Sequence, residues 1–223
     1  MTYPEVAWAV LAVVGAYLLG SSPVGVVVCR VGFGIEILAR GSRRSGATNV
    51  YRTVGLPAAA IVFAGDFLKG LAPTLVARLV WGESQTVPAM VACAATIGHN
   101  WSVFMRFRGG RGVTTSWGAV MALAPIAAVI GVPIGLATLY VGRYVSLSSL
   151  VGAVGFLVAA AIFYALNLGV SGTYVALIAG FVVFLFTQHL DNVQRLFAGT
   201  ERRLAPWPDL MAGRGPRGRG GTR

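Results

Sequence analysis

The apolar stretch VTTSWGAVMALAPIAAVIGVPIGLATLYV, residues 113–141, decides how this chain is arranged. It is long enough to cross a bilayer once, because about 20 residues span the hydrocarbon core. Pro125 and Pro133 interrupt it, however, and a proline disturbs the hydrogen bonding of a helix interior. Two interpretations are therefore open at this point: one span, or two shorter helices that fold back on each other.

The composition is that of a membrane protein. Hydrophobic residues make up 56% of the 223 residues and charged residues only 11%, with a mean hydropathy of +0.74, whereas an average soluble domain carries about 25% charged residues. The other apolar stretches that can cross a bilayer are 6–28, 56–80, 87–104, 144–166 and, marginally, 173–187.

The basic loops set the orientation of these spans. Because cytoplasmic loops carry the excess of Lys and Arg, segments 30–52, 106–111 and the chain from Arg195 are placed in the cytoplasm, with the N-terminus outside. The number of crossings between the last two segments must then be even. We therefore interpret 113–141 as a pair of short, Pro-interrupted helices that return to the cytoplasmic side at Arg143. The predicted fold is an all-α integral membrane bundle of about seven transmembrane helices, with a cytoplasmic C-terminus.

The net charge of +11 comes almost wholly from arginine, since Lys69 is the single lysine. The basic stretches are short and adjoin apolar segments, which favours anionic lipid or a phosphorylated substrate over nucleic acid as the partner. Residues 1–204 are expected to form one domain in the cell membrane. Residues 205–223, rich in Gly, Pro and Arg, are expected to be disordered.

The first cytoplasmic loop, residues 41–52 (GSRRSGATNVYR), combines glycine, hydroxyl and arginine side chains. Glycine lets backbone N–H groups approach a phosphate, and a guanidinium group binds it with two parallel hydrogen bonds. The loop is therefore a candidate anion site, although a plain positive-inside loop has the same charge. Its candidate residues are Ser42, Thr48, Asn49 and Arg52.

The second loop contains His99 and the sequence FRGGRGVTT, residues 107–115, which leads into a helix N-terminus. Helix N-termini attract anions through free N–H groups. The spacing of a nucleotide-binding P-loop is absent. The alternatives to an anion site are a simple turn for the glycine-rich sequence and a structural role for His99. The candidates are His99, Gly109, Gly110, Arg111 and Gly112.

The third segment, 188–201, follows the last apolar stretch. On a helix, His189, Asn192 and Arg195 share one face. A histidine titrates near pH 6.5, so His189 can accept a hydroxyl proton at neutral pH, although a helix-end histidine is often structural.

Acidic residues are few and scattered, seven in all. Asp66 lies inside the span 56–80, one turn before Lys69, and a charge at that depth is expected to pair. A carboxylate metal site or a two-carboxylate mechanism is not supported by this distribution.

Taken together, these loops resemble the bacterial PlsY family of acyl-phosphate:glycerol-3-phosphate acyltransferases from about Gly20 to Glu201. The matching residues are Gly20-Ser21-Ser22-Pro23, Gly41-Ser42, Gly46-Ala47-Thr48-Asn49-Val50 with Arg52, Asp66 with Leu68-Lys69-Gly70, Gly98-His99, Gly109-Gly110 with Gly112-Val113, Tyr144-Val145-Ser146-Leu147 with Ser149, and His189 with Asn192, Arg195-Leu196, Gly199 and Glu201. The chain departs from the family pattern at Arg43-Arg44, at Arg111, where lysine is usual, and at Gln188.

The resemblance implies about seven helices, no metal and no cofactor. It implies transfer of an acyl group from acyl phosphate to the 1-hydroxyl of glycerol-3-phosphate, which yields 1-acyl-glycerol-3-phosphate and phosphate, the first step of phospholipid synthesis. The implied catalytic residues are Ser42, Arg52, Ser149, His189 and Asn192. The implied substrate-binding residues are Thr48, Asn49, Lys69, His99, Gly109, Gly110, Arg111, Gly112 and Ser146. Membrane lipids are the expected partners, and the active site is expected to face the cytoplasm.

Two other functions stay open at this point. One is a transporter or channel for an anionic metabolite, weakly supported by the Gly and Pro breaks. The other is an acyltransferase that uses acyl-CoA, but the His-x-x-x-x-Asp signature is absent, because the fifth residue after His99 is Phe104 and the fifth after His189 is Gln194. Whether His189 is a general base or only positions substrate is also open.

Overall fold

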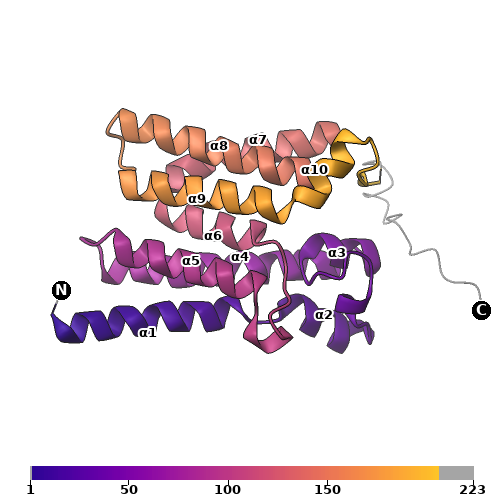
Figure 1. Ribbon diagram of the computed structural model, residues 1–223, viewed down its shortest axis with the longest axis horizontal. Coiled ribbons are helices and arrows are strands. Elements are labelled where there is room, and N and C mark those ends of the chain that lie inside the picture. Colours follow the sequence, from indigo (N-terminus) through magenta and orange to yellow (C-terminus); the bar gives the residue numbers. More distant parts are fainter. Residues whose placement is uncertain (1, 206–223) are drawn as a thin grey trace, which may run out of the picture.

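The computed structural model describes residues 2–205, an elongated bundle of α-helices with no strand in that range (Figure 1). The α-helices are α1 (Tyr3–Gly20), α2 (Val24–Phe33), α3 (Ala47–Thr53), α4 (Leu56–Val80), α5 (Thr86–Asn100), α6 (Val113–Leu123), α7 (Pro125–Gly142), α8 (Val145–Ala165), α9 (Gly172–Gln188) and α10 (Leu190–Phe197), with 3₁₀ turns at Ile37–Ala39 and Val103–Met105. The predicted tail, beyond residue 205, lies outside the described residues.

Four helical segments in residues 2–205 are long and apolar enough to cross a membrane. They are Tyr3–Phe33, α4, α7 and α8, and the bent pair of α9 and α10 makes a fifth when it is counted as one span. The prediction of an all-helical membrane protein is confirmed. The total of about seven spans and the side on which each end of the chain lies stay predictions.

The apolar stretch 6–28 is divided in two, which the sequence analysis did not predict. α1 ends at Gly20, and α2 begins at Val24 after Pro23, whose ring cannot continue the ladder of hydrogen bonds. The freed carbonyls find side-chain donors, because Ser102 Oγ donates to Ser21 O at 2.5 Å and Lys69 Nζ donates to Ser22 O at 3.2 Å. The backbone carbonyls at the break therefore have hydrogen-bond partners, as expected where unpaired backbone groups in lipid are costly.

The stretch 113–141 forms the predicted pair of helices. The chain breaks at Ala124, and Pro125 starts α7 at a position where its missing N–H costs nothing. Both ends of the pair lie at the same end of the bundle, since Arg111 contacts Asp191 and Arg143 O accepts a hydrogen bond from Leu204 N. The prediction that Pro133 also interrupts the helix is wrong, because α7 continues through it.

Small residues let the helix backbones touch. A Cβ added to Gly70 would overlap the carbonyl of Thr115, and one added to Gly118 would overlap the carbonyl of Phe67, so α4 and α6 are in backbone contact. Gly20 meets the carbonyl of Ala95 in the same way. Such contacts are typical of membrane helices, which associate through close packing because lipid is as apolar as their side chains.

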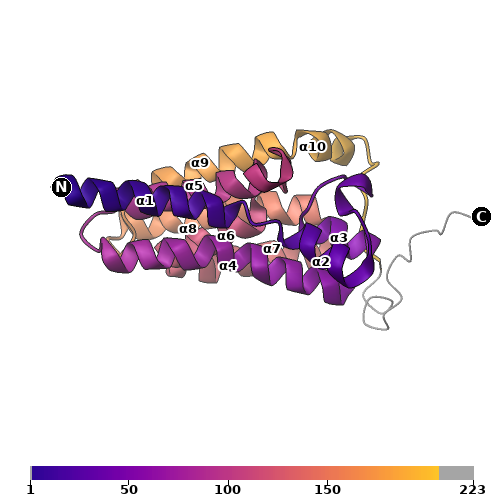
Figure 2. The ribbon, with the colours of Figure 1, turned by 90° about the horizontal axis from the view of Figure 1, so that it is seen from below.

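The loops that carry the candidate residues gather at one end of the bundle. In Figure 1 and in the view turned by 90° (Figure 2), α2, α3 and α10 lie at one end, and the start of α1 lies at the other. We call the first the arginine-rich end and define it by residues 34–55, 101–112 and 189–205.

Substitution of Gly70 by alanine is expected to destabilise the bundle by about 1–3 kcal/mol, the usual cost of overpacking, because the new methyl group meets the backbone of α6. Thermal unfolding in detergent micelles measures the effect. Gly180→Ala, at a glycine of α9 with no atom within 4 Å of the added Cβ, is the matched control. Equal melting temperatures for the two variants would contradict the backbone contact.

Candidate functional site

Three segments far apart in the sequence meet at the arginine-rich end. Arg44 Nη1 donates to Gly110 O at 3.1 Å, which joins the first loop to the second. Arg111 contacts Asp191 at 2.7 Å, which joins the second loop to α10. Arg52 Nη2 donates to the carbonyl of Arg202 at 3.3 Å, which closes the ring of contacts. The three segments that the sequence analysis assigned to one site are therefore neighbours.

The carboxylate of Glu201 organises the third segment. It accepts hydrogen bonds from Ser146 Oγ at 2.9 Å, Asn192 Nδ2 at 2.7 Å and Arg195 Nε at 2.7 Å, and the residue is 8% exposed. Burial raises the pKa of Glu201, but the hydrogen bonds from Arg195, Asn192 and Ser146 outweigh this effect and hold the pKa below its usual value. Glu201 is therefore ionised and fixes two of the predicted site residues, Ser146 and Asn192.

Asp191 forms a second and more exposed link. Arg111 Nη2 reaches both of its carboxylate oxygens, at 3.0 and 2.7 Å, and Arg195 approaches at 3.3 Å. Partial burial raises the pKa of Asp191, but the charges of Arg111 and Arg195 outweigh it, so the pKa is lowered. Arg111 is thus aimed across the glycine-rich loop towards α10 by an ion pair at the surface.

His189 lies in the break between α9 and α10, whose axes differ by 64°. Its Nδ1 is 2.8 Å from Leu185 O. Because a carbonyl only accepts, Nδ1 carries the proton and the Nε2 of the neutral ring is an acceptor. Burial lowers the pKa of His189 to about 4; the hydrogen bond to Leu185 opposes this shift, and the charges of Arg111 and Arg44 add to it. The imidazole is therefore neutral at pH 7.

The first loop is held by Asn49. Its Oδ1 accepts a hydrogen bond from the backbone N–H of Ser42 at 3.0 Å, and its Nδ2 donates to the carbonyls of Ile37, Arg40 and Arg44. These contacts show that Asn49 holds the first loop in place; its assignment to substrate binding stays a prediction. Ser42 itself is exposed, and Asn49 positions it.

Lys69 and His99 are buried beneath the site. Asp66 Oδ1 lies 2.8 Å from Lys69 Nζ and 3.4 Å from His99 Nδ1, so the predicted pairing of Asp66 with Lys69 is confirmed. The His99 carbonyl accepts a hydrogen bond from Gly110 N at 3.2 Å, and a Cβ on Gly110 would overlap the His99 ring. His99 therefore supports the glycine-rich loop, Lys69 holds the break after α1 through Ser22 O, and both side chains are buried.

Among the described residues, the remaining candidates form no hydrogen bond that joins two of the three segments, apart from the bond of Arg52 to Arg202 given above. Ser149 Oγ donates to Val145 O in α8, at 2.8 Å. Thr48 is half-buried on α3, and Arg52 is half-buried beside Glu201. Gly112 has a φ of +80°, which favours glycine at the N-cap of α6.

Arg44 and Asp191 were not among the predicted site residues, and Glu201 was named only as a match to the family pattern. The distribution of charge could have identified the two acids. The chain has seven acidic and 18 basic residues, and two of the seven acids lie on either side of Arg195, in the segment that also contains His189. In residues 2–205 no group of three or more His, Cys, Asp and Glu side chains could hold a metal ion. The chemistry on offer is cationic and hydrogen-bonding: guanidinium groups, hydroxyls and a neutral imidazole.

Comparisons with known proteins agree on one family. The family model described as Glycerol-3-phosphate acyltransferase matches residues 10–199. A glycerol-3-phosphate acyltransferase of Thermus thermophilus is 43% identical over 189 residues, which cover 85% of this chain and 92% of the relative. That of Thermoanaerobacter sp. (strain X514) is 39% identical over 198 residues, which cover 88% and 96%.

Two solved structures are similar in fold. The crystal structure of PlsY (YgiH), an integral membrane glycerol 3-phosphate acyltransferase, in its glycerol 3-phosphate form has a TM-score of 0.82 and 32% identity, covering 92% of this chain and 98% of that chain. The lysophosphatidic acid form gives a TM-score of 0.81 and 31% identity, with the same coverage.

Replacement of Glu201 by glutamine is expected to lower stability at pH 7 by about 1.5–3 kcal/mol, the usual worth of hydrogen bonds to a charged group. A carboxylate whose folded pKa is lowered contributes stability above its unfolded pKa of about 4.3 and loses it as the pH falls through the folded value. The difference in melting temperature between wild type and Glu201→Gln should therefore be constant near pH 7 and shrink as the pH falls below about 4.3.

Glu83→Gln is the control for this measurement, because Glu83 lies exposed in the turn between α4 and α5, at the other end of the bundle. It should cost little at any pH. A Glu201→Gln deficit that stays constant down to low pH would contradict an ionised Glu201.

Proposed function

Because the chain belongs to the glycerol-3-phosphate acyltransferase family, we propose that its arginine-rich end transfers an acyl group from an acyl phosphate to the 1-hydroxyl of glycerol-3-phosphate. The products are 1-acyl-glycerol-3-phosphate and inorganic phosphate. The observation that carries the proposal is the set of contacts Arg44–Gly110, Arg111–Asp191 and Arg52–Arg202, which places two guanidinium groups at the glycine-rich loop and joins Arg52 to the third segment.

The phosphate of glycerol-3-phosphate is assigned to residues 109–112 together with Arg111 and Arg52. Backbone N–H groups before a helix N-terminus and guanidinium groups are the donors that phosphate prefers. Asp191 engages only Nη2 of Arg111, so phosphate can bind the other N–H groups of this guanidinium and must replace Asp191 only to reach Nη2. Since Asp191 is half-exposed, their ion pair is a weak one that a phosphate dianion can replace at small cost.

The acyl phosphate supplies its own leaving group. The hydroxyl oxygen forms a bond to the acyl carbon, the bond from that carbon to the phosphate oxygen breaks, and the proton ends on the released phosphate. The protein has to hold two anions together and orient the hydroxyl, and placement of this kind supplies much of the rate. Ser42 and Asn192 are assigned to hydrogen bonds with the reacting phosphate or the developing oxyanion, with Ser149 beside them.

His189 is assigned to the attacking hydroxyl. Its Nε2 is the free acceptor of the ring, because Nδ1 donates to Leu185 O. With a pKa of about 4 the imidazole is a weak base, which favours a role as the acceptor that aligns the hydroxyl while a phosphate oxygen takes the proton. Of the two roles that the sequence left open, positioning is therefore the better supported.

The site is assigned to the cytoplasmic face of the cell membrane. The arginines of segments 34–55, 101–112 and 189–205 follow the positive-inside rule, and this orientation places the N-terminus outside. The acyl chain of the donor is expected to enter sideways from the lipid, because the outer surfaces of the helices are apolar.

Purified protein is expected to release phosphate from acyl phosphate only when glycerol-3-phosphate is added, with little transfer from acyl-CoA or acyl carrier protein thioesters. Arg52→Gln should lower kcat/KM by about 100-fold, the scale found when one charge-stabilising donor is removed. Arg40→Gln removes the same charge from an exposed position of the same loop and should change little.

Two results would contradict the proposal. One is uptake of glycerol-3-phosphate into vesicles by a protein that transfers no acyl group, which would indicate a transporter. The other is equal activity of the Arg52→Gln and Arg40→Gln variants.

The kcat/KM of the wild type is expected to lack an inflection from His189 near pH 6.5, because the pKa of this group lies near 4. His189→Gln should reduce turnover by about 10- to 100-fold through misplaced substrate without altering the shape of the profile. An inflection that both proteins share belongs to the substrates, since phosphate monoesters titrate near pH 6. An acidic limb near pH 6.5 that disappears in His189→Gln would restore the general-base role.

A further inference from the structure

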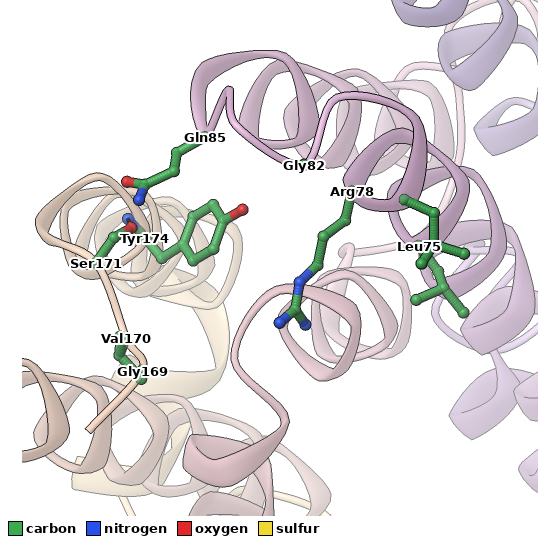
Figure 3. A pocket seen from close by; sticks show the side chains of 9 residues that line it. Leu75, Arg78, Gly82, Gln85, Gly169, Val170, Ser171 and Tyr174 are labelled. Atoms are coloured by element: carbon green, nitrogen blue, oxygen red, sulfur yellow. Dashed lines mark hydrogen bonds between the residues drawn. The ribbon is translucent and has the colours of Figure 1, made fainter.

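The end of the bundle opposite to the arginine-rich end contains a pocket of about 600 Å³. It lies between the last turn of α4, the turn into α5, the turn between α8 and α9, and the first turn of α9 (Figure 3). Neither the acyl transfer proposed above nor the family resemblance uses any of its residues. The polar groups around it are Arg78, Gln85, Ser171 and Tyr174.

Arg78 gives the pocket a positive charge that no acid neutralises. Its Nη1 donates to Ala122 O, at the end of α6, at 2.6 Å. No carboxylate lines the pocket, and Arg78 takes part in no ion pair of the described residues. In Figure 3 the Arg78 side chain extends from α4 across the pocket, on the side opposite to Tyr174 and Ser171. Its remaining N–H groups are therefore available to an anion.

The neighbouring groups are neutral donors. Ser171 Oγ accepts a hydrogen bond from Tyr174 N at 3.3 Å, which leaves the hydroxyl proton free to donate. The Tyr174 hydroxyl projects into the pocket from the opposite wall, and the Gln85 amide stands at its rim (Figure 3). A half-buried arginine with uncharged donors around it is suited to the oxygens of a phosphate.

The open side of the pocket is apolar. Leu75 and Leu79 are one turn apart on α4, and Leu79 is 75% exposed. On a helix that spans the membrane this face meets lipid chains, so a ligand that enters here carries hydrocarbon next to its charge. A free phosphate ion would gain nothing from these two side chains.

We propose that this pocket binds the phosphate headgroup of an anionic membrane lipid, with Arg78 on the phosphate and the acyl chains along Leu75 and Leu79. A lipid headgroup and a free phosphate ion would both bind Arg78 through phosphate oxygens. The apolar side chains of Leu75 and Leu79 favour the lipid, because only the lipid carries acyl chains. The site lies at the far end of the helices from Arg52 and His189, so it takes a lipid of the opposite leaflet, distinct from the substrates of the acyl transfer.

The test counts lipids that stay bound to the purified protein in native mass spectrometry. The probes are phosphatidylglycerol, phosphatidylcholine and inorganic phosphate. Gln85→Glu places a negative charge at the rim without touching the bond from Arg78 to Ala122, and it should reduce phosphatidylglycerol binding about tenfold through repulsion at short range. Arg78→Gln should reduce it at least as much.

Thr86→Glu is the matched control, because it adds the same charge at the next, exposed residue, which does not line the pocket. It should bind phosphatidylglycerol like wild type, and any lipid held at the arginine-rich end is common to all variants. Equal losses in Gln85→Glu and Thr86→Glu, or equal retention of phosphatidylcholine, would overturn the proposal. Thermal stabilisation by inorganic phosphate equal to that by the lipid would overturn the choice of a lipid.

Discussion

The carboxylate of Glu201 accepts hydrogen bonds from side chains on two helices, and the order of the arginine-rich end depends on it. Ser146 lies in the first turn of α8, while Asn192 and Arg195 lie on α10, so one acid fixes the distance between these elements. A buried acid with hydrogen-bonded partners stays charged, and its loss would leave donors unsatisfied. Because α10 also carries Asp191, the position of Arg111 and of the glycine-rich loop follows from the same anchor.

A second buried charge supports the same loop from within the membrane. Asp66 neutralises Lys69 and approaches His99, and the His99 backbone and ring shape the path of Gly109 and Gly110. Lys69 at the same time satisfies a carbonyl at the break between α1 and α2. The glycine-rich loop is thus held on one side by the exposed pair of Arg111 and Asp191 and on the other by His99, which the buried Asp66 approaches.

Much of this was accessible from the sequence, because it depends on local patterns. The span 56–80 coincides with α4, and the parity of the basic loops correctly required a helical pair in 113–141. The break at Ser21–Pro23 was not predicted, although Ser21-Ser22-Pro23 marks it in the sequence, because the run 6–28 was judged by its length and hydropathy alone. The groups that satisfy its carbonyls, Ser102 and Lys69, are remote in sequence. For the same reason the roles of Asn49 and Glu201 were missed: motif matching marks a residue but does not say which partners consume its hydrogen bonds.

In the proposed acyl transfer, the pairing of Arg111 with Asp191 also determines which anions can bind when substrate is scarce. Asp191 is tethered to the protein and therefore present at high local concentration, so a singly charged ion from solution competes poorly for the guanidinium. A doubly charged phosphate monoester brings twice the charge and three acceptor oxygens, and it can displace the resident carboxylate. Between turnovers of the proposed reaction, the Arg111 guanidinium is paired with Asp191. Singly charged anions are therefore expected to bind there more weakly than a phosphate monoester.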